Sequence, residues 1–188
     1  MRIIGGSAKG KKILVPYDKK TRPLKDRVKE SIFNILTHSN LLKKKLNKCI
    51  LLDLFSGVGS FGLEAISRGV EKVIFFESYK PSFNVLKKNI ESLNFTNKSD
   101  IYRSDIYKTN DLKNINCQFD LVFFDPPFKD INFVSTLKIL VKNKKLQKSN
   151  LIIIHRHKKS QDKFDKDFKV IREEVYGISK IIFGYFTI

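Results

Sequence analysis

The sequence lacks the features of several large protein classes. No apolar run approaches the roughly 20 residues that span a membrane, and Met1 to Gly6 do not have the architecture of a signal peptide. The two cysteines, Cys49 and Cys117, stand without a Cys-x-x-Cys pair, and the three histidines are not spaced as metal ligands. We therefore expect a cytoplasmic protein with reduced thiols, no bound metal and no membrane contact.

Acidic residues are scarce relative to basic ones. The chain has 37 lysines and arginines against 19 aspartates and glutamates, a formal net charge of +18, which favours a polyanionic partner. Part of this charge follows from a composition rich in Lys, Asn, Ile and Phe, as an AT-rich genome produces. The stronger signal is a local cluster near the N-terminus, made of Lys9, Lys11, Lys12, Lys19, Lys20, Arg22, Lys25, Arg27 and Lys29.

The order of apolar segments predicts an α/β fold. Strands and helices alternate from residue 49 onward, which predicts a mostly parallel, doubly wound sheet with right-handed crossovers. Two short strands, Arg2–Ile4 and Lys11–Val15, are expected to form an N-terminal β-hairpin, and a helix is expected to begin at Thr21-Arg22-Pro23. We expect residues 1–40 to form this extension and residues 41–188 the main domain. The other expected strands are 49–54, 72–77, 100–103, 119–124, 151–154, 169–176 and 180–186, and the other expected helices are 63–68, 81–93 and 132–141.

Carboxylates end successive expected strands, namely Asp53, Glu77, Asp105 and Asp125. In a parallel sheet the carboxyl ends share one edge, and ligands bind there. After the first strand, Gly57, Gly59 and Gly62 match G-x-G-x-x-G between a strand and a helix, the context that a cofactor-binding loop requires. Glu77, about twenty residues further on, is placed to bind both ribose hydroxyls of an adenosine cofactor.

The glycine pattern by itself also fits a nicotinamide-binding Rossmann unit. Asp53 argues against NAD, because it precedes the first glycine at a position that is usually apolar in dinucleotide folds and would repel a pyrophosphate. An acid there suits the cationic amino group of a methionine moiety better. S-adenosyl-L-methionine is therefore the favoured cofactor, and NAD is the less favoured alternative.

The turn Asp125-Pro126-Pro127-Phe128 follows an apolar run, 119–124, that is expected as a buried parallel strand. Neither proline has an N–H and both have a fixed φ, so the turn is stiff. The Asp125 carboxylate and the Pro126 carbonyl then form two acceptors beside the Phe128 ring, which suits a planar base with an exocyclic amine. Such a motif is typical of amino-group methyltransferases, and we predict that Asp125, Pro126, Pro127 and Phe128 are catalytic.

On these motifs the chain resembles the RsmD family of 16S rRNA guanine-N2 methyltransferases, from Arg2 to about Phe128. The N-terminal motifs are the more specific part of the resemblance, because several amino-methyltransferase families share Asp-Pro-Pro. The matching segments are Arg2-Ile3-Ile4-Gly5-Gly6, Lys9-Gly10-Lys11, Thr21-Arg22-Pro23, Asp26-Arg27-Val28-Lys29-Glu30, Phe33-Asn34, Asp53-Leu54-Phe55-Ser56-Gly57-Val58-Gly59, Gly62-Leu63-Glu64-Ala65, Ser67-Arg68-Gly69 and Asp125-Pro126-Pro127-Phe128.

The resemblance implies a Rossmann-like class I S-adenosylmethionine-dependent methyltransferase with a seven-stranded, mostly parallel sheet and an N-terminal β-hairpin extension. It implies that Glu77 holds the cofactor ribose, that Asp105 holds the adenine amine and that the glycine loop lies under the methionine portion. The expected cofactor-binding residues are Asp53, Phe55, Gly57, Gly59, Gly62, Glu77, Ser78, Asp105 and Ile106.

The resemblance also implies one guanine of 16S rRNA, in the small ribosomal subunit or an assembly intermediate, as the substrate of a monomeric enzyme. We expect Lys9, Lys11, Lys12, Arg22 and Arg27 to bind RNA. Two positions depart from the family pattern. Leu24 stands where Thr is frequent, and His155-Arg156-His157 stands where an acidic residue is common.

Other functions share parts of this pattern. A DNA amino-methyltransferase acting on adenine N6 or cytosine N4 would have the same turn, but it usually carries a target-recognition segment for which this chain has little room. A protein-glutamine methyltransferase would favour Asn in place of Asp125. An RNA-binding protein with a vestigial cofactor fold is a further alternative from a different class.

Overall fold

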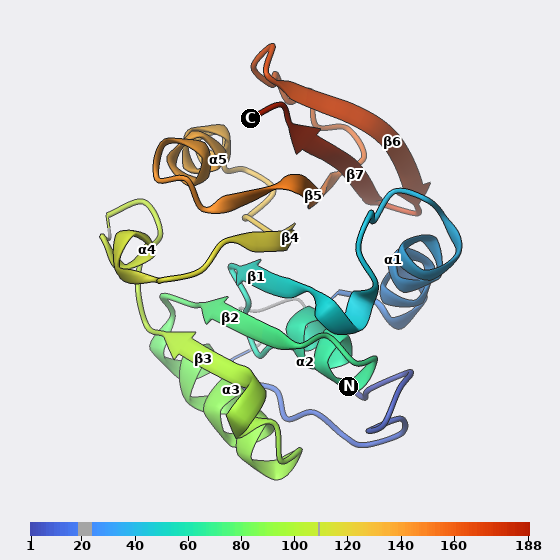
Figure 1. The fold of residues 1–188 in the computed structure, drawn as a ribbon. Coiled ribbons are helices and arrows are strands. Elements are labelled where there is room, and N and C mark those ends of the chain that lie inside the picture. The colour runs from blue at the N-terminus through green and yellow to red at the C-terminus, as the bar shows by residue number, and fades with distance from the viewer. Residues whose placement is uncertain (19–23, 109) are drawn as a thin grey trace.

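The computed structural model describes residues 1–18, 24–108 and 110–188, and within them the chain forms a three-layer α/β fold (Figure 1). The central sheet has seven strands in the order β3-β2-β1-β4-β5-β7-β6. Strands β1 to β5 run parallel, and β7 pairs antiparallel with both β5 and β6. The predicted doubly wound, mostly parallel sheet is therefore confirmed. The strands are β1 Ile50–Leu54, β2 Lys72–Phe76, β3 Ser99–Tyr102, β4 Phe119–Phe124, β5 Leu146–His157, β6 Phe168–Tyr176 and β7 Ser179–Phe186.

Helices cover both faces of the sheet. The helices α1 (Asp26–His38), α2 (Ser60–Ser67) and α3 (Lys80–Ser92) pack on one face, while α4 (Asp111–Asn114) and α5 (Phe133–Lys142) pack on the other. Because successive strand residues point to opposite faces, each face takes alternate side chains from β1 and β4. This burial on both sides explains why the central strands are almost uninterrupted apolar runs. Short 3₁₀ turns at Leu46–Lys48 and Thr96–Lys98 precede β1 and β3.

The N-terminal segment, residues 1–18, bonds to α2 and α3 and forms only a short version of the predicted hairpin. Its expected strands are reduced to one antiparallel bridge between Arg2 and Lys12. The backbone groups that would extend the ladder bond elsewhere: Ile4 N–H donates to Glu64 Oε2 at 2.8 Å and Leu14 N–H donates to Asn89 Oδ1 at 2.8 Å. The two expected segments therefore pair only over this short stretch, where Ile3 N–H donates to the Lys11 carbonyl and Ile13 N–H donates to the Met1 carbonyl, both at 2.9 Å. A hairpin with the predicted full-length strands does not form among the described residues.

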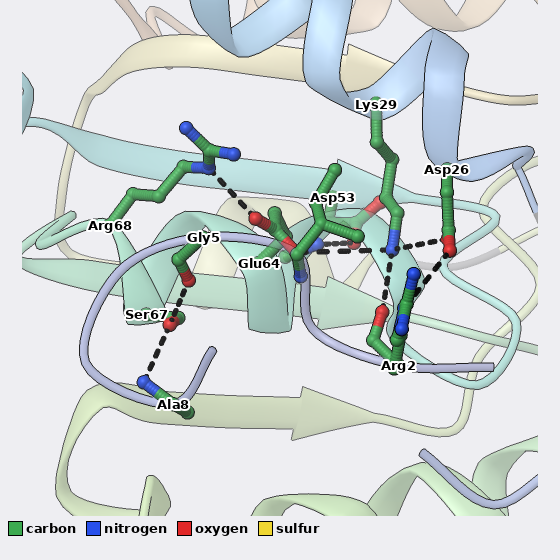
Figure 2. Close-up of polar contacts among 11 residues, drawn as sticks. Arg2, Gly5, Ala8, Asp26, Lys29, Asp53, Glu64, Ser67 and Arg68 are labelled. Atoms are coloured by element: carbon green, nitrogen blue, oxygen red, sulfur yellow. Dashed lines mark hydrogen bonds and ion pairs between the residues drawn. The ribbon is translucent and has the colours of Figure 1, made fainter. Parts of the chain in front are cut away.

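A buried polar network ties the N-terminal segment to α1 and α2 (Figure 2). The ammonium group of Lys29 lies 3.9 Å from Glu64 Oε2 and 3.6 Å from Asp26 Oδ1, and it donates to the Arg2 carbonyl at 3.2 Å. Arg68 Nε donates to the second Glu64 oxygen at 2.8 Å. Burial lowers the pKa of Lys29, an effect opposed by the charges of Glu64 and Asp26. Fully buried charges of this kind require such partners.

Several element bounds differ from the sequence expectations. Strand β5 is much longer than 151–154, because it begins at Leu146 and continues through His157 while pairing with both β4 and β7. The short helix α4 was not predicted, since four residues carry too little periodicity to detect. The expected start of α1 at Thr21-Arg22-Pro23 lies outside the described residues. Among the described residues, no helix has both the length and the apolar character that a membrane span needs.

Candidate active site

The loop between β1 and α2 is a tight turn that needs left-handed backbone conformations. Phe55 has a φ of 59°, Gly57 one of 57° and Gly59 one of 84°. Gly59 precedes the first turn of α2, where its carbonyl accepts a hydrogen bond from Leu63 N–H at 2.9 Å. Glycine at 57 and 59 adopts this geometry without strain. The predicted glycine loop is therefore present at the carboxyl edge of the sheet.

Asp53 lies in β1 beneath this loop and is almost fully buried, with 1% of its surface exposed. Its Oδ2 accepts a hydrogen bond from Gly62 N–H at 3.0 Å. Its Oδ1 is buried without a hydrogen-bond partner among the described residues. Burial raises the pKa of Asp53 well above its usual range, the nearby charges of Asp125 and Glu77 raise it further, and the Gly62 N–H lowers it. A cationic donor at Oδ1 would satisfy this oxygen and compensate the buried charge.

Gly62 has a packing role within the chain. A Cβ atom at this position would lie 2.2 Å from the Phe75 ring and 2.8 Å from Asp53 Oδ2. The missing side chain therefore lets α2 approach β2 closely and brings the Gly62 N–H to the Asp53 carboxylate.

Glu77 follows β2 and connects to the glycine loop. Its Oε2 accepts a hydrogen bond from Gly57 N–H at 2.7 Å, and its Oε1 accepts one from Tyr79 N–H at 2.6 Å. Burial raises the pKa of Glu77, and backbone N–H groups of Tyr79, Gly57 and Ser78 lower it. A carboxylate has about four lone-pair sites, so both oxygens keep acceptor capacity for hydroxyl donors. The exposed Ser78 directly follows on the same loop.

Asp105 and Ile106 follow β3 on the loop next to Phe55. Asp105 Oδ1 accepts a hydrogen bond from Tyr107 N–H at 3.0 Å, and Ile106 is buried. The Tyr107 ring packs against Phe55 at 5.7 Å between centroids, and its hydroxyl donates to Asp130. This aromatic contact connects the β3 loop to the β1 loop, at the same edge of the sheet.

The turn Asp125-Pro126-Pro127-Phe128 directly follows β4, as predicted. Asp125 Oδ1 lies 2.8 Å from His155 Nδ1, while its Oδ2 has no hydrogen bond within the described part of the chain. The Pro126 carbonyl likewise accepts none from the described residues. Phe128 is 36% exposed, and its ring packs edge-on with His155 at 5.2 Å and His157 at 5.4 Å. The turn therefore presents free acceptors beside a partly exposed aromatic ring.

Two residues of β5 that the sequence prediction omitted hold this turn. His155 bonds Asp125, and the buried Arg156 donates from Nη1 to the Pro127 carbonyl at 3.0 Å and from Nη2 to the Asp130 carbonyl at 2.8 Å. Arg156 also forms an ion pair with Asp162 at 3.0 Å and stacks over the Phe133 ring at 4.5 Å. Their departure from the family pattern, at the end of an apolar strand, was the only signal in the sequence.

A small cavity of about 30 Å³ brings the two motifs together. Asp53 and Asp125 both line it, so the carboxylates of β1 and the β4 turn share one space. Leu24 forms an apolar part of its wall. The other lining residues are Phe55, Ser56, Gly57, Val58, Ser60, Phe61 and Phe123.

Four of the predicted RNA-binding residues, namely Lys9, Lys11, Lys12 and Arg27, do not line this cavity. Lys9, Lys11 and Lys12 are exposed on the N-terminal segment, and Arg27 is exposed on α1. Arg22 lies outside the described residues. The described residues contain no group of three or more His, Cys, Asp or Glu side chains that could hold a metal ion.

A family model described as Conserved hypothetical protein 95 matches residues 1–185. The chain belongs to this family, the RsmD family of methyltransferases. It is 33% identical over 180 residues to the Ribosomal RNA small subunit methyltransferase D of Haemophilus influenzae, covering 95% of this chain and 90% of that protein. The match spans nearly the whole chain, including the segment after Phe128 where the motif resemblance weakens.

Solved structures of family members and more distant methyltransferases have the same fold. The Escherichia coli protein yhhF superposes with a TM-score of 0.80 at 27% identity, covering 98% of this chain and 96% of that one. An RNA methyltransferase from Salinibacter ruber, solved in complex with S-adenosyl-L-homocysteine, superposes with a TM-score of 0.61 at 15% identity, covering 86% of this chain and 92% of that one. At that identity, the second likeness concerns the fold alone.

Proposed function

We propose that this protein transfers a methyl group from S-adenosyl-L-methionine to the exocyclic N2 of one guanine in 16S rRNA. The substrate is the RNA of the small ribosomal subunit or its assembly intermediate. The observation that carries the proposal is the shared cavity, which joins the carboxylate of the Asp125-Pro126-Pro127-Phe128 turn to Asp53 and the glycine loop. Membership in a family of rRNA small subunit methyltransferases supports the choice of RNA.

The residues at the carboxyl edge fit this cofactor. Asp53 offers a buried, unpartnered carboxylate oxygen to the cationic amino group of the methionine moiety. Glu77 accepts the ribose hydroxyls, and Asp105 accepts the adenine amine, with Ile106, Phe55 and Ser78 beside them. When bound, the cofactor supplies a methyl group that its sulfonium already activates.

The β4 turn orients the guanine amine. Asp125 Oδ2 and the Pro126 carbonyl both lack partners within the described residues, so they are open to accept the two N2 hydrogens. These two hydrogen bonds favour a pyramidal nitrogen, aim its lone pair, and stabilise the positive charge that develops there. Phe128 stacks on the base after it leaves the RNA stack. Asp125 then takes up the proton that N2 loses.

The basic cluster binds the RNA backbone. Lys9, Lys11, Lys12, Arg22 and Arg27 neutralise phosphates and position the RNA without reading its sequence. In this proposal residues 1–40 act as the RNA-contacting extension of the methyltransferase domain at 41–188. The protein acts as a monomer.

The test is methyl transfer from labelled S-adenosylmethionine to unmodified 30S subunits, naked 16S rRNA and duplex DNA, offered side by side. Digestion to nucleosides then identifies the product. N2-methylguanosine from the ribosomal substrates alone is the expected result, and its distribution between 30S subunits and naked rRNA identifies the assembly state. Label in DNA as N6-methyladenine or N4-methylcytosine would replace the proposal with a DNA amino-methyltransferase. Cofactor binding without transfer to any of these substrates would contradict it.

A further inference from the structure

His155 lies between the catalytic turn and the antiparallel strand β7. Its Nδ1 is 2.8 Å from Asp125 Oδ1, and its Nε2 is 2.9 Å from Ser179 Oγ. His155 is 7% exposed and Ser179 is 6% exposed, so water is largely excluded from both contacts. The three side chains come from the β4 turn, β5 and the first residue of β7, and they form one continuous hydrogen-bonded chain.

The chemistry of these three groups determines which atom donates and which accepts in each hydrogen bond. An ionised carboxylate only accepts hydrogen bonds, so Nδ1 of His155 must carry the proton that bonds Asp125. In the neutral imidazole Nε2 is then an acceptor, and the Ser179 hydroxyl donates to it. The Asp125 carboxylate therefore fixes the tautomer, and Ser179 holds the ring through Nε2. The order of hydrogen bonds is the same as in a Ser-His-Asp catalytic triad, but here the buried Ser179 anchors the imidazole against Asp125.

The consequence concerns the two oxygens of Asp125. The bond from His155 occupies Oδ1, and Oδ2 has no partner within the described residues. A carboxylate held through one oxygen cannot rotate freely about its χ2, so the other oxygen keeps a defined direction. The aromatic contact between His155 and Phe128 at 5.2 Å places the same imidazole against the ring at the end of the turn.

We propose that His155, held at Nε2 by Ser179, is the positioning residue that aims Asp125 Oδ2 at the substrate amine. This inference rests on the proposed function for its catalytic consequence. His155 takes no proton from the substrate, because Nδ1 already carries one and Nε2 accepts that of Ser179. Asp125 remains the group that contacts the guanine.

The kinetic test compares two substitutions that each retain one half of the imidazole. An asparagine amide places a donor near the Nδ1 position, whereas a glutamine amide reaches toward the Nε2 position and Ser179. We expect His155→Gln to lower kcat by about 10–100-fold, the range found when supporting residues of active sites are lost. We expect His155→Asn to retain most of the rate. The KM for the RNA and the Kd for S-adenosylmethionine should stay within about twofold in both variants.

Controls separate positioning from folding. The exposed His38 on α1 lies away from the turn, and His38→Gln should match the wild-type kcat. Ser179→Ala should lower kcat less than His155→Gln does, because it removes the hydroxyl that holds Nε2 but keeps the Nδ1–H donor to Asp125. An unchanged kcat in His155→Gln would overturn the inference. A parallel loss of melting temperature and cofactor affinity in His155→Asn and His155→Gln would show a structural role and overturn it as well.

A spectroscopic readout requires no RNA. Proton–nitrogen correlation spectra of the histidine side chains report which imidazole nitrogen carries the proton, and the chain has only three histidines to assign. We expect the Nδ1–H form for His155 in the wild type and in Ser179→Ala, because the Asp125 carboxylate accepts from Nδ1 in both. A Nε2–H form in the wild type would overturn the inference. If the wild type methylates no ribosomal substrate, the proposed function fails, and the spectrum still decides whether His155 donates to Asp125.

Discussion

At the scale of single residues, the site contains groups that reduce the stability of the free protein. Asp53 is the clearest example, because its carboxylate is buried and one of its oxygens has no partner among the described residues. Such a group costs free energy in the folded state until a ligand compensates it. Phe55, two residues further on, has a φ of 59°. This left-handed conformation is strained for a residue other than glycine.

Replacing Asp53 by asparagine should separate stability from cofactor binding. The pKa of Asp53 is raised in the folded state, so its penalty is absent below the unfolded value of about 4 and grows as the pH rises through the folded pKa. Asp53→Asn removes this penalty, and it should raise the melting temperature at pH 8 by a few °C, with little change at pH 4. Thermal melts across pH measure this effect.

The same variant should bind S-adenosylmethionine at least about tenfold more weakly in calorimetry, because a neutral amide does not pair with the amino group. Asp100→Asn is the matched control, since Asp100 is a half-exposed acid in an ion pair with Lys72 and contacts no part of the site. A melting temperature of Asp53→Asn below that of the wild type at pH 8 would contradict the account.

Replacing Asp125 by alanine should abolish turnover. The variant loses the acceptor for the substrate amine but no proposed cofactor contact, so kcat should fall by about 10³-fold or more, as when a preorganised group at the reacting centre is removed. Calorimetry should give a cofactor Kd close to that of the wild type. Weaker cofactor binding instead would move Asp125 from the substrate to the cofactor. Asp165→Ala, which removes an exposed ion pair with Lys138, serves as control.

At the scale of elements, the N-terminal segment is part of the core. Ile3, Ala8 and Ile13 are almost fully buried and belong to the same hydrophobic cluster as α1, α2 and the inner face of the sheet. Ser67 on α2 holds the segment twice, since its hydroxyl donates to the Gly5 carbonyl at 2.6 Å and accepts from Ala8 N–H at 2.9 Å. The exposed lysines of this segment therefore lie between residues that are buried in the core.

Deleting residues 1–15 should destabilise the whole protein. Each buried isoleucine contributes about 2–5 kcal/mol relative to alanine, and the deletion also leaves Glu64 without the Ile4 N–H. We expect a melting temperature at least about 10 °C lower, measured by differential scanning fluorimetry. Lys9→Gln/Lys11→Gln/Lys12→Gln in the intact chain should melt within about 2 °C of the wild type. A fully stable deletion variant would show that the segment is only an appendage.

At the scale of the whole molecule, the positive charge is spread along the chain, whereas the candidate site is confined to the carboxyl edge of the sheet. A net charge of +18 favours the approach of a polyanion from any direction. Attraction by a diffuse charge is the same wherever on the protein a lysine is removed, whereas a specific phosphate contact is lost only when its own lysine is removed. Replacing equal numbers of lysines at two places therefore distinguishes the two kinds of attraction.

The triple replacement of Lys9, Lys11 and Lys12 by glutamine should weaken RNA binding and flatten its salt dependence. Each lost phosphate contact reduces the slope of log K against log salt by about 0.7 on single-stranded RNA, so the slope should fall by about 2. Titrations of a 16S rRNA fragment at salt concentrations from about 50 to about 300 mM measure this slope. Equal charge removed at the exposed Lys142, Lys144 and Lys148, at the end of α5, just after it and in β5, should leave the slope nearly unchanged. Equal losses in both variants would make the binding purely diffuse.

Local sequence signals were sufficient for much of this protein. The apolar run 119–124 coincides with β4, because a strand buried on both faces requires apolar residues at every position. The acids at the strand ends and the glycines after β1 could also be located from the sequence. Parallel connectivity places all these strand ends at one edge of the sheet. These features depend on the order of residues and of strands along the chain, and that order can be read from the sequence.

Contacts between distant segments depended on the tertiary structure alone. His155 meets Asp125 and Ser179 only because β5 lies between β4 and an antiparallel β7, and no periodicity in the chain encodes that pairing. The N-terminal strands are short, and backbone groups next to their pairing bond Glu64 and Asn89, partners 60 and 75 residues away. Backbone and buried polar groups bond whichever partner packing brings near them, and that choice is made by the folded core rather than by neighbours in the chain.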